Sequence, residues 1–378
     1  MDLKELRAEI DAVDTQIAQL FSRRMQLGGA VADYKREHSL AVMNSQREQQ
    51  VLERVSSLVG EDLAPDARVL FASMMDMSKA LQHRRLGRPL PLLGLIENAR
   101  SLPKHARVCC QGVPGAFSQR ACQAVFEHPQ TQFVPEFEDV FQAVSRGECE
   151  FGILPIENSS AGSVTAVYDL MKRHQFYIAR SVRVKVEHNL LVKPGTTLDK
   201  ITDLYSHEQA ISQCSQFLRS HPQITVHPYS NTAKSAQLVA QDTSPGTAAI
   251  SSRECAQLYG LTVLESGIQN SQQNYTRFIC ITREPVVYEK ADKVSVMLSI
   301  PHTAGSLYRV LSRFSYGGIN LTKLESRPIP DTDFEFMFYF DLQCPKDPGL
   351  LAGILEDLQE ELDTFVFLGA YQEQSEDL

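Results

Sequence analysis

The chain has 378 residues, of which 43% are hydrophobic and 22% are charged, and its formal net charge is -9. This length allows two or three domains that each bury a core. The acidic balance argues against nucleic acid as the main partner, because binding phosphates requires a concentrated basic face.

The sequence also lacks the signals of membrane insertion, secretion and metal binding. No apolar run approaches the roughly 20 residues that span a bilayer, and the charged N-terminal stretch does not resemble a signal peptide. The eight cysteines are scattered without C-x-x-C or paired histidine spacing, so neither disulfides nor a zinc site is expected. We therefore expect a cytoplasmic protein without a metal or cofactor.

Residues 1–86 have the pattern of helices. Apolar residues recur at spacings of three and four along residues 3–35, which predicts one amphipathic helix. At 1.5 Å per residue such a helix is roughly 50 Å long, too long for a compact domain of this size. Two shorter helices are predicted at 45–58 and 66–84. Three such helices cannot easily close a core alone, so we expect an all-α domain that forms an intertwined dimer.

Two cations on the first predicted helix indicate an anion site. Arg24 and Lys35 are close to three helical turns apart, so they share a face and lie about 16 Å apart along the axis. Their long side chains can bracket a small dianion. Arg7 lies about 100° away around the helix, and in a dimer it would enter the partner's pocket. Taken alone, however, helical arginines and lysines are usually solvated surface residues.

The spacing of these cations and of several polar residues resembles the all-helical chorismate mutase family. The pattern is L-R-x-x-I-x-x-x-D, R-x(10)-K, R-E at the start of a helix and S-x-x-x-Q, and it covers residues 3–83. The resemblance implies these substrate contacts: Arg7 from the partner subunit, Arg24, Lys35, Asn44, Arg47, Glu48, Ser78 and Gln82. Asn44 stands where this family usually has Asp.

The chemistry of this family needs no nucleophile. Rearrangement of chorismate to prephenate is unimolecular, so the enzyme holds a flexible dicarboxylate in a compact conformer, which arginines do through bidentate hydrogen bonds. It also stabilises negative charge on the breaking ether oxygen. Lys35 and Gln82 are suited to donate to that oxygen, and they are the expected catalytic residues.

After residue 86 the sequence pattern changes from helical to a mixture of strands and helices. Residues 87–105 hold three prolines and two glycines and are predicted to form a linker. From residue 106 short β-rich runs alternate with helical stretches, which is typical of an α/β fold. Five polar blocks follow in order: QGVPGAFSQ, PIENS, YSHEQA with Gln213, NTA and NYTRF. Each alone is consistent with a tight turn or capped loop, and the absence of G-x-G-x-x-G disfavours a dinucleotide.

Together the five blocks resemble the prephenate dehydratase family over residues 106–282. The resemblance implies a domain over residues 106–284 with two α/β lobes and a cleft between them, like a periplasmic binding protein. It implies that Thr276 contacts the leaving hydroxyl as a catalytic residue, and Glu157 is a candidate acid. The implied substrate contacts are Asn158, Ser206, Gln213, Thr232, Arg277 and Phe278. Arg277 is alternatively a structural ion-pair partner.

Residues 292–372 are predicted to fold as strand, helix, strand, strand, helix, strand, which is a small α+β ferredoxin-like sandwich. A glycine turn before the first helix and the segment ESRP resemble the ACT regulatory domain of phenylalanine-inhibited dehydratases. The resemblance implies a phenylalanine site at a dimer interface, with the residues Gly305, Ser306, Leu307, Asn320, Leu321, Glu325, Ser326, Arg327 and Pro328. Ser306 replaces a common Ala. Without the resemblance, a plain dimerisation domain fits the pattern equally well.

The three regions together predict a bifunctional enzyme of phenylalanine biosynthesis. It would be an isomerase (chorismate mutase) and a lyase (prephenate dehydratase) that is inhibited by L-phenylalanine. The expected partners are chorismate, prephenate and L-phenylalanine, with the chain as a homodimer or higher homo-oligomer. Two alternatives stay open at this point: a non-enzymatic amino-acid sensor, and an arogenate dehydratase in the second domain.

Overall fold

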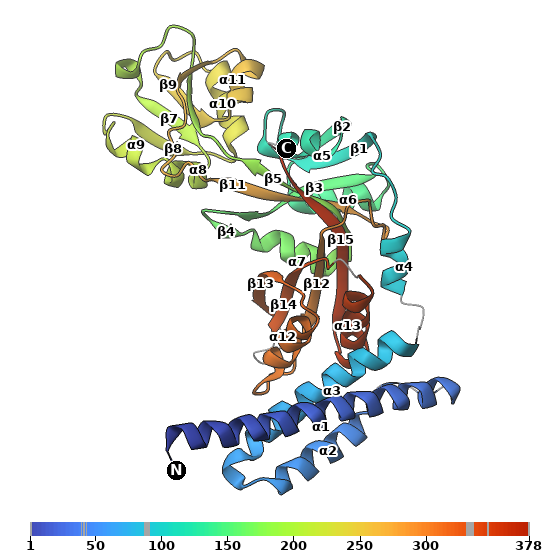
Figure 1. Ribbon diagram of the computed structural model, residues 1–378. Coiled ribbons are helices and arrows are strands. Elements are labelled where there is room, and N and C mark those ends of the chain that lie inside the picture. Colours follow the sequence, from blue (N-terminus) through green and yellow to red (C-terminus); the bar gives the residue numbers. More distant parts are fainter. Residues whose placement is uncertain are drawn as a thin grey trace. The chain divides into compact units, whose positions relative to one another are not determined.

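The computed structural model describes residues 2–376, except residues 39, 41, 43, 87–90, 330–335 and 346–347. It divides into two compact units (Figure 1). The first unit combines residues 1–97 with 295–367, and the second combines residues 98–294 with 368–378. None of the helices that the structure describes has the length and hydropathy of a membrane span.

The first unit opens with three helices and one short 3-10 turn: α1 (Leu3–Glu37), α2 (Ser45–Leu58), η1 (Glu61–Leu63) and α3 (Ala64–Leu86). All three predicted helices are present, and α2 has the predicted bounds. A capping box between Asp2 and Glu5 starts α1, and the side chain of Asn44 caps α2. These caps satisfy backbone N–H groups that have no partner inside the helix.

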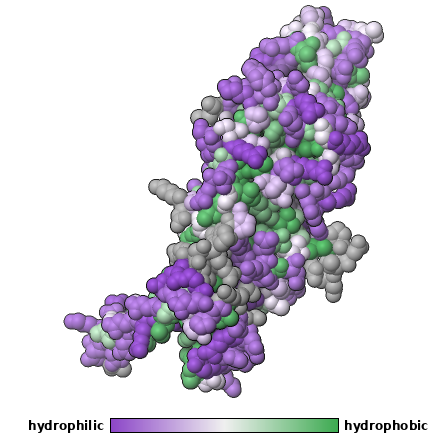
Figure 2. Space-filling model, turned by 90° about the vertical axis from the view of Figure 1, so that its right-hand side faces the viewer, coloured by the Kyte–Doolittle hydropathy of each residue, from purple (hydrophilic) through white to green (hydrophobic). Residues whose placement is uncertain are grey.

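Most of α1 is exposed in the single chain. Among the residues that the structure describes, only Gly28, Gly29 and Ala32 of this helix are buried. The apolar stripe that predicted the helix lies at the surface, where Leu20 is 64% and Ile10 is 57% exposed. Figure 2 shows hydrophobic side chains, in green, at the surface of the helical region at the foot of the view. The described part of one chain therefore leaves this stripe uncovered.

One helix lies where only a linker was expected. Residues Pro91–Glu97 form α4, and Leu92 is buried. The proline stands at the first helical position, where its missing N–H costs no helical hydrogen bond. The linker predicted over residues 87–105 therefore contains a helix, and residues 87–90 lie outside the described part of the chain.

Six elements make up the C-terminal region: β12 (Lys293–Ser299), α12 (Ser306–Tyr316), β13 (Leu321–Pro328), β14 (Phe336–Gln343), α13 (Pro348–Glu361) and β15 (Phe365–Ser375). Their order is the one predicted from the sequence. The strands are arranged β13-β14-β12-β15, so the first and last strands of the region are neighbours, and β14 and β12 are the central pair. The N-terminal part of β15 belongs to the first unit and its C-terminal part to the second.

The second unit contains two α/β lobes, as predicted (Figure 1). The first lobe has the strands β1 (His105–Gln111), β2 (His128–Val134), β3 (Phe151–Asn158), β4 (Gly162–Ser163), β5 (Tyr177–Lys185) and β11 (Tyr275–Thr282). Its helices are α5 (Phe117–Val125), α6 (Phe137–Ser145) and α7 (Thr165–His174). The strand order is β5-β11-β3-β1-β2, and β15 joins the edge through residues 372–375, which pair in parallel with β5.

The second lobe has its own sheet in the order β10-β6-β9-β7-β8. Its elements are β6 (Asn189–Val192), η2 (Leu198–Lys200), β7 (Asp203–Ser206), α8 (Glu208–Gln213), α9 (Ser215–Arg219), β8 (Thr225–Pro228), α10 (Thr232–Gln241), β9 (Thr247–Ser251), α11 (Arg253–Tyr259) and β10 (Thr262–Glu265). Each lobe buries a separate apolar core. The chain crosses between the lobes after β5 and returns before β11, so the residues at both crossings are brought close together.

Candidate functional site

The helical region brings three of the predicted residues together. Lys35 Nζ donates to Gln82 Oε1 at 3.2 Å and to the Val42 carbonyl at 2.6 Å. Gln82 Nε2 in turn donates to Ser78 Oγ at 3.3 Å, one turn away on α3. Ser78 and Gln82 are buried, whereas Lys35 is half-buried. The cluster therefore joins a cation of α1 to two polar groups of α3.

The arginines predicted for this site have different environments. Arg24 is half-buried on α1 and donates from Nη1 to the Met74 carbonyl at 3.0 Å. Burial lowers the pKa of Arg24 and the pKa of Lys35, although the charge of Glu48 partly opposes the change at Lys35. Arg7 is exposed near the start of α1. It lies far along the helix from Lys35, as the sequence predicted.

The start of α2 supplies the remaining predicted residues. Asn44 accepts a hydrogen bond from Arg47 N at 2.9 Å through its side chain, so it acts as the helix cap. The Arg47 side chain is exposed and donates to Gln50 at 3.4 Å. Glu48 is half-buried and lies 3.3 Å from Lys79 Nζ. The structure thus joins Glu48 to α3, while Asn44 and Arg47 contact their own helix.

Lys79 was not predicted as part of this site, yet it is the buried cation behind Glu48. Its Nζ lies 3.0 Å from Asp76 and 3.1 Å from Glu361 of α13. Arg313 of α12 pairs with the same two carboxylates. Burial alone would lower the pKa of Lys79, but Asp76, Glu361 and Glu48 raise it. The spacing of Asp76 and Lys79 is visible in the sequence, whereas the contact with Glu361 bridges 282 positions.

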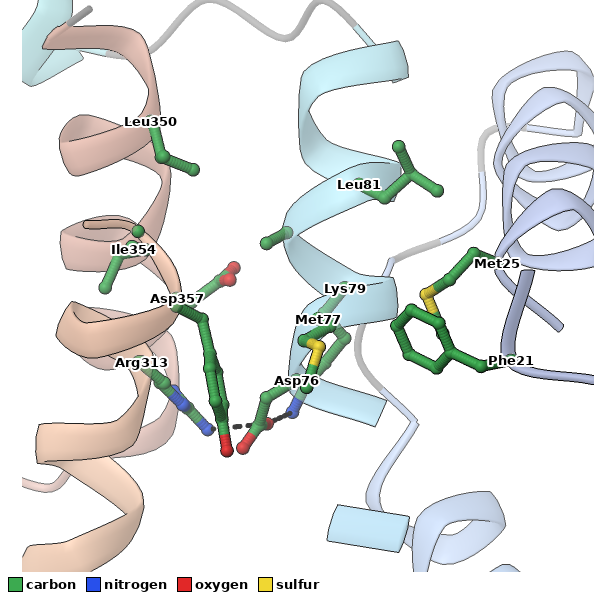
Figure 3. Close-up of a pocket in the computed structure, with 13 residues that line it drawn as sticks. Phe21, Met25, Asp76, Met77, Lys79, Leu81, Arg313, Leu350, Ile354 and Asp357 are labelled. Atoms are coloured by element: carbon green, nitrogen blue, oxygen red, sulfur yellow. Dashed lines mark hydrogen bonds and ion pairs between the residues drawn. The ribbon is translucent and has the colours of Figure 1, made fainter. Parts of the chain in front are cut away.

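Three of these charged residues, Asp76, Lys79 and Arg313, border a cavity of about 370 Å³ in the first unit. Figure 3 shows Asp76 and Lys79 of α3 and Arg313 of α12 meeting at the edge of this space. Its other walls are mostly apolar, from residues such as Phe21 and Ile354. Burial among such groups strengthens the ion pairs, because little water screens them.

The first lobe of the second unit brings together the residues predicted around Thr276. Strand β11 places Thr276 opposite Asn158 of β3, and Asn158 Nδ2 donates to Thr276 Oγ1 at 3.0 Å. Gln213, at the end of α8 in the second lobe, donates from Nε2 to Asn158 Oδ1 at 3.3 Å. Asn158 is buried, and Thr276 is half-buried. Three predicted residues from three elements therefore form one hydrogen-bonded cluster.

Two further polar residues complete this cluster and were not predicted as site residues. Asn274 Nδ2 donates to Gln213 Oε1 at 3.0 Å, and Asn158 Nδ2 lies 3.0 Å from Asn274 Oδ1. His188 Nε2 lies 2.9 Å from the same Gln213 Oε1. Burial lowers the pKa of His188, which the hydrogen bond to Gln213 opposes. Asn274 stands two residues before Thr276, and this spacing along a strand predicts a shared face.

The other residues predicted for the dehydratase region fall into two groups. Ser206, at the end of β7, is buried and donates to the Ile250 carbonyl at 2.8 Å, while Thr232 starts α10. Both belong to the second lobe, where parallel strands end and ligands of such sheets bind. Phe278 is only 4% exposed and belongs to the apolar core of the first lobe. Its prediction as a substrate contact is therefore corrected to a core residue.

Glu157 and Arg277 lie on the other face of the sheet from Thr276. They pair across β3 and β11 one position along from the pair of Asn158 and Thr276, and successive residues of a strand point to opposite faces. Arg277 is buried and binds Glu373 of β15 at 2.8 Å. The structure thus favours the alternative of a structural ion-pair partner for Arg277, and it places Glu157 away from the Thr276 hydroxyl.

The C-terminal region holds the residues predicted to bind an effector. Gly305 has a φ of 81° and precedes α12, a conformation that favours glycine. Ser306 Oγ lies 2.7 Å from Thr303 Oγ1, and both residues line a cavity of about 320 Å³ together with Leu307 and Phe338. The other predicted residues lie on or just before β13 and do not line this cavity: Asn320, Leu321, Glu325, Ser326, Arg327 and Pro328. In one chain, the predicted effector-binding residues therefore lie in two separate places.

Comparison with known proteins agrees with the prediction of two enzyme domains. The family models for chorismate mutase type II and for prephenate dehydratase match residues 6–83 and 108–286. The bifunctional chorismate mutase/prephenate dehydratase of Escherichia coli (strain K12) is 31% identical over 99% of this chain and 97% of its own length. Arogenate dehydratase/prephenate dehydratase 6 of Arabidopsis thaliana is 34% identical over 77% of this chain and 74% of its own.

A solved structure supports the same assignment. Prephenate dehydratase from Arthrobacter aurescens, in complex with L-Phe, is 30% identical, has a TM-score of 0.63 and covers 70% of this chain and 89% of that chain. The folds, clusters and matches define an enzyme that joins an isomerase domain to a lyase domain. The chain belongs to the family of bifunctional chorismate mutase/prephenate dehydratases. The predicted enzymatic function is thereby confirmed over the non-enzymatic sensor.

Proposed function

We propose that the helical region rearranges chorismate at the cluster around Lys35. Arg24 would bind a substrate carboxylate through paired hydrogen bonds, and Lys35 and Gln82 would donate to the ether oxygen as its bond breaks. The hydrogen bond from Lys35 Nζ to Gln82 Oε1 supports this role, because it brings the two side chains together. Gln82 Nε2 donates to Ser78 and has a second hydrogen to offer the substrate. The other proposed contacts are Arg47, Glu48, Ser78 and the backbone or side chain of Asn44.

We propose that the helical region works as a homodimer. The exposed apolar stripe on α1 supports this, because a helix this long with few buried residues needs a second surface to cover it. Arg7 lies on the exposed part of the same helix and would complete the pocket of the partner subunit. A cytoplasmic location belongs to the same proposal and is consistent with eight free cysteines.

We propose Thr276 as the catalytic residue of the dehydratase. Prephenate loses its ring carboxylate as carbon dioxide, the released electron pair makes the ring aromatic, and the ring hydroxyl leaves. Asn158 donates to Thr276 Oγ1, so the threonine proton points elsewhere and can donate to the departing hydroxyl. Asn158 would bind the substrate from the first lobe, and Gln213, Ser206 and Thr232 would bind it from the second lobe. This hydrogen-bonded cluster is the observation that carries the assignment.

We propose that residues 292–372 form an ACT regulatory domain that binds L-phenylalanine. The order of the six elements supports this fold. A cavity of about 320 Å³ beside the Gly305 turn has room for a small amino acid and has Ser306 in its wall. The relative from Arthrobacter aurescens was solved with L-Phe. Residues of β13 would complete the site from a partner subunit, because they lie outside this cavity in one chain.

Two measurements test these proposals. Purified protein should turn over prephenate with a kcat/KM at least tenfold above that for arogenate, in which an amino group replaces the keto group. Turnover of arogenate alone would instead assign the activity that some plant relatives are named for. Calorimetry should show that the protein binds L-phenylalanine and that Ser306→Ala changes the affinity. A lack of binding at millimolar concentration would contradict the proposed regulatory site.

A further inference from the structure

The side chain of Arg277 connects β11, the strand that carries Thr276, to β15, the last strand of the chain. Arg277 directly follows Thr276 on β11 and points to the opposite face of the sheet. Its Nε lies 3.0 Å from Ser181 Oγ and 2.8 Å from the Glu373 carboxylate. Its Nη2 donates to the Tyr371 hydroxyl at 2.7 Å. The guanidinium therefore reaches across β5 to two residues of β15.

The residues that make these contacts are buried, and a second cation also binds Glu373. Tyr371 and Ser181 are fully buried, and the side chains of Arg277 and Glu373 are 10% and 13% exposed. Lys293 also binds Glu373, at 2.8 Å, which fixes the position of the carboxylate. A planar guanidinium with several bound donors has little freedom to move. Arg277 is therefore a rigid connection and not a solvated cation.

The backbone beside Thr276 needs such a connection. The pairing between β11 and β3 is regular at Thr276 and Arg277 but shifts between Arg277 and Phe278, where a residue of β3 is skipped. Such bulges break the ladder of hydrogen bonds and re-aim neighbouring side chains. Phe278 is then paired with Pro155, which has no N–H to donate. The side-chain contacts of Arg277 restrain the strand where its backbone pairing on that side is interrupted.

We propose that Glu373 and Tyr371 are positioning residues of the dehydratase, which act through Arg277 to hold the Thr276 hydroxyl against the leaving group. The proposal rests on the assignment of Thr276 as the catalytic residue. It assigns a role in the reaction to a strand outside the segment matched by the dehydratase family, which ends at residue 286. A displacement of about 1 Å at a reacting group can cost on the order of 100-fold in rate.

The positioning role predicts a specific pattern of kinetic effects. Glu373→Gln removes the charge that Arg277 binds, and Tyr371→Phe removes only a hydroxyl, so it keeps the shape of the core. Both variants should lower the dehydratase kcat, by about tenfold for Glu373→Gln and by about threefold for Tyr371→Phe. KM for prephenate should stay within twofold, because neither residue is proposed to bind substrate. The mutase kcat of the same preparations should not change.

The chain offers a matched control for the loss of an ion pair. Glu376 follows the end of β15 and pairs with Arg120 of α5, with 2.6 Å between Nη2 and Oε2. Glu376→Gln therefore makes the same substitution near the same strand end but leaves the contacts of Arg277 in place. Its dehydratase kcat should stay within twofold of the parent. An equal loss in Glu376→Gln and Glu373→Gln would indicate general destabilisation of β15 and overturn the proposal.

A double-mutant cycle separates positioning of Thr276 from any other effect. In a Thr276→Ala background, Glu373→Gln should cause no further loss of kcat, because the hydroxyl that it positions is gone. A full additional loss in that background would show that Glu373 acts elsewhere. A rise in KM at unchanged kcat would show that Arg277 binds the substrate itself. Normal turnover by Thr276→Ala alone would instead contradict the assignment of Thr276, which is a separate failure.

Discussion

At the scale of single residues, the Thr276 hydroxyl is the group on which the dehydratase assignment depends. It accepts from Asn158 and keeps its own proton to donate. Thr276→Ala should therefore lower the dehydratase kcat by roughly 100- to 1000-fold, the usual loss for a donor at a developing anion. Thr276→Ser keeps the hydroxyl and is the control. The variants are compared by an assay of prephenate turnover, with mutase activity measured in parallel. Full dehydratase activity of the alanine variant would exclude Thr276 as the catalytic residue.

Lys35 gives the mutase a predictable dependence on pH. Burial lowers the pKa of Lys35 from its ordinary 10.5, although Glu48 partly opposes this. The protonated form donates to the substrate, so activity is present below the lowered pKa and is lost as pH rises through it. The mutase kcat should therefore decline at a pH below 10.5. A profile that stays flat up to that pH, in protein shown to be folded, would contradict the role of Lys35.

The comparison of Thr276 with Arg277 shows what the sequence could and could not predict at this scale. The motif T-R-F marked all three residues, and alternation along a strand already places Thr276 and Arg277 on opposite faces. The partners of Arg277 could not be predicted, because Tyr371 and Glu373 lie 94 and 96 positions further on. Phe278 was misassigned for the same kind of reason: its burial depends on strands that no local pattern places beside it.

At the scale of elements, helices with strong periodicity were predicted well. The bounds of α2 agree with the prediction, and α1 runs two residues beyond it, because apolar spacing and caps are local signals. The short helix α4 was missed since prolines and glycines dominate its surroundings, and the packing of residues such as Leu92 against distant parts of the chain stabilises it. The bulge at Arg277 depends on pairing between distant strands and leaves no local signal in the sequence.

The exposed stripe of α1 predicts a dimer whose loss affects one activity only. Ile10→Glu puts a charge into the proposed interface and should yield monomers by analytical ultracentrifugation. Mutase activity should fall at least 100-fold, because Arg7 of the partner is then missing from the pocket, while dehydratase activity persists. Gln19→Glu, on the opposite side of α1, adds the same charge as a control. A monomeric Ile10→Glu variant with full mutase activity would refute the shared pocket.

The ion pairs of Glu361 predict how the first unit responds to pH. Burial alone would raise the pKa of Glu361, but Arg313 and Lys79 lower it below its ordinary 4.5. Its contribution to stability is therefore complete above that ordinary value and is lost as pH falls through the lowered pKa. Glu361→Gln should reduce the free energy of unfolding at pH 7 by about 2 kcal/mol.

The difference between Glu361→Gln and the parent should shrink as the pH falls below 4.5. Urea unfolding followed by circular dichroism measures it, and Glu360→Gln, an exposed neighbour, is the matched control. A difference that stays constant down to acid pH would show that the ionised carboxylate of Glu361 is not the source of the stability.

At the scale of the whole molecule, the order of regions was predicted but their grouping was not. The chain order of helical, α/β and C-terminal regions follows from composition and periodicity. The structure places the helical and C-terminal regions in one unit, through contacts such as that between Lys79 and Glu361. No pattern within either region indicates this, because both residues have ordinary surface types and lie 282 positions apart.

Both domains together carry chorismate through prephenate to phenylpyruvate on one chain. The most direct test supplies purified protein with chorismate alone and follows phenylpyruvate by its ultraviolet absorbance. Phenylpyruvate should appear after a lag in which prephenate accumulates, and Thr276→Ala should stop the sequence at prephenate. Added L-phenylalanine should slow its formation. If the parent protein consumes chorismate but leaves added prephenate unchanged, the second domain is not a prephenate dehydratase.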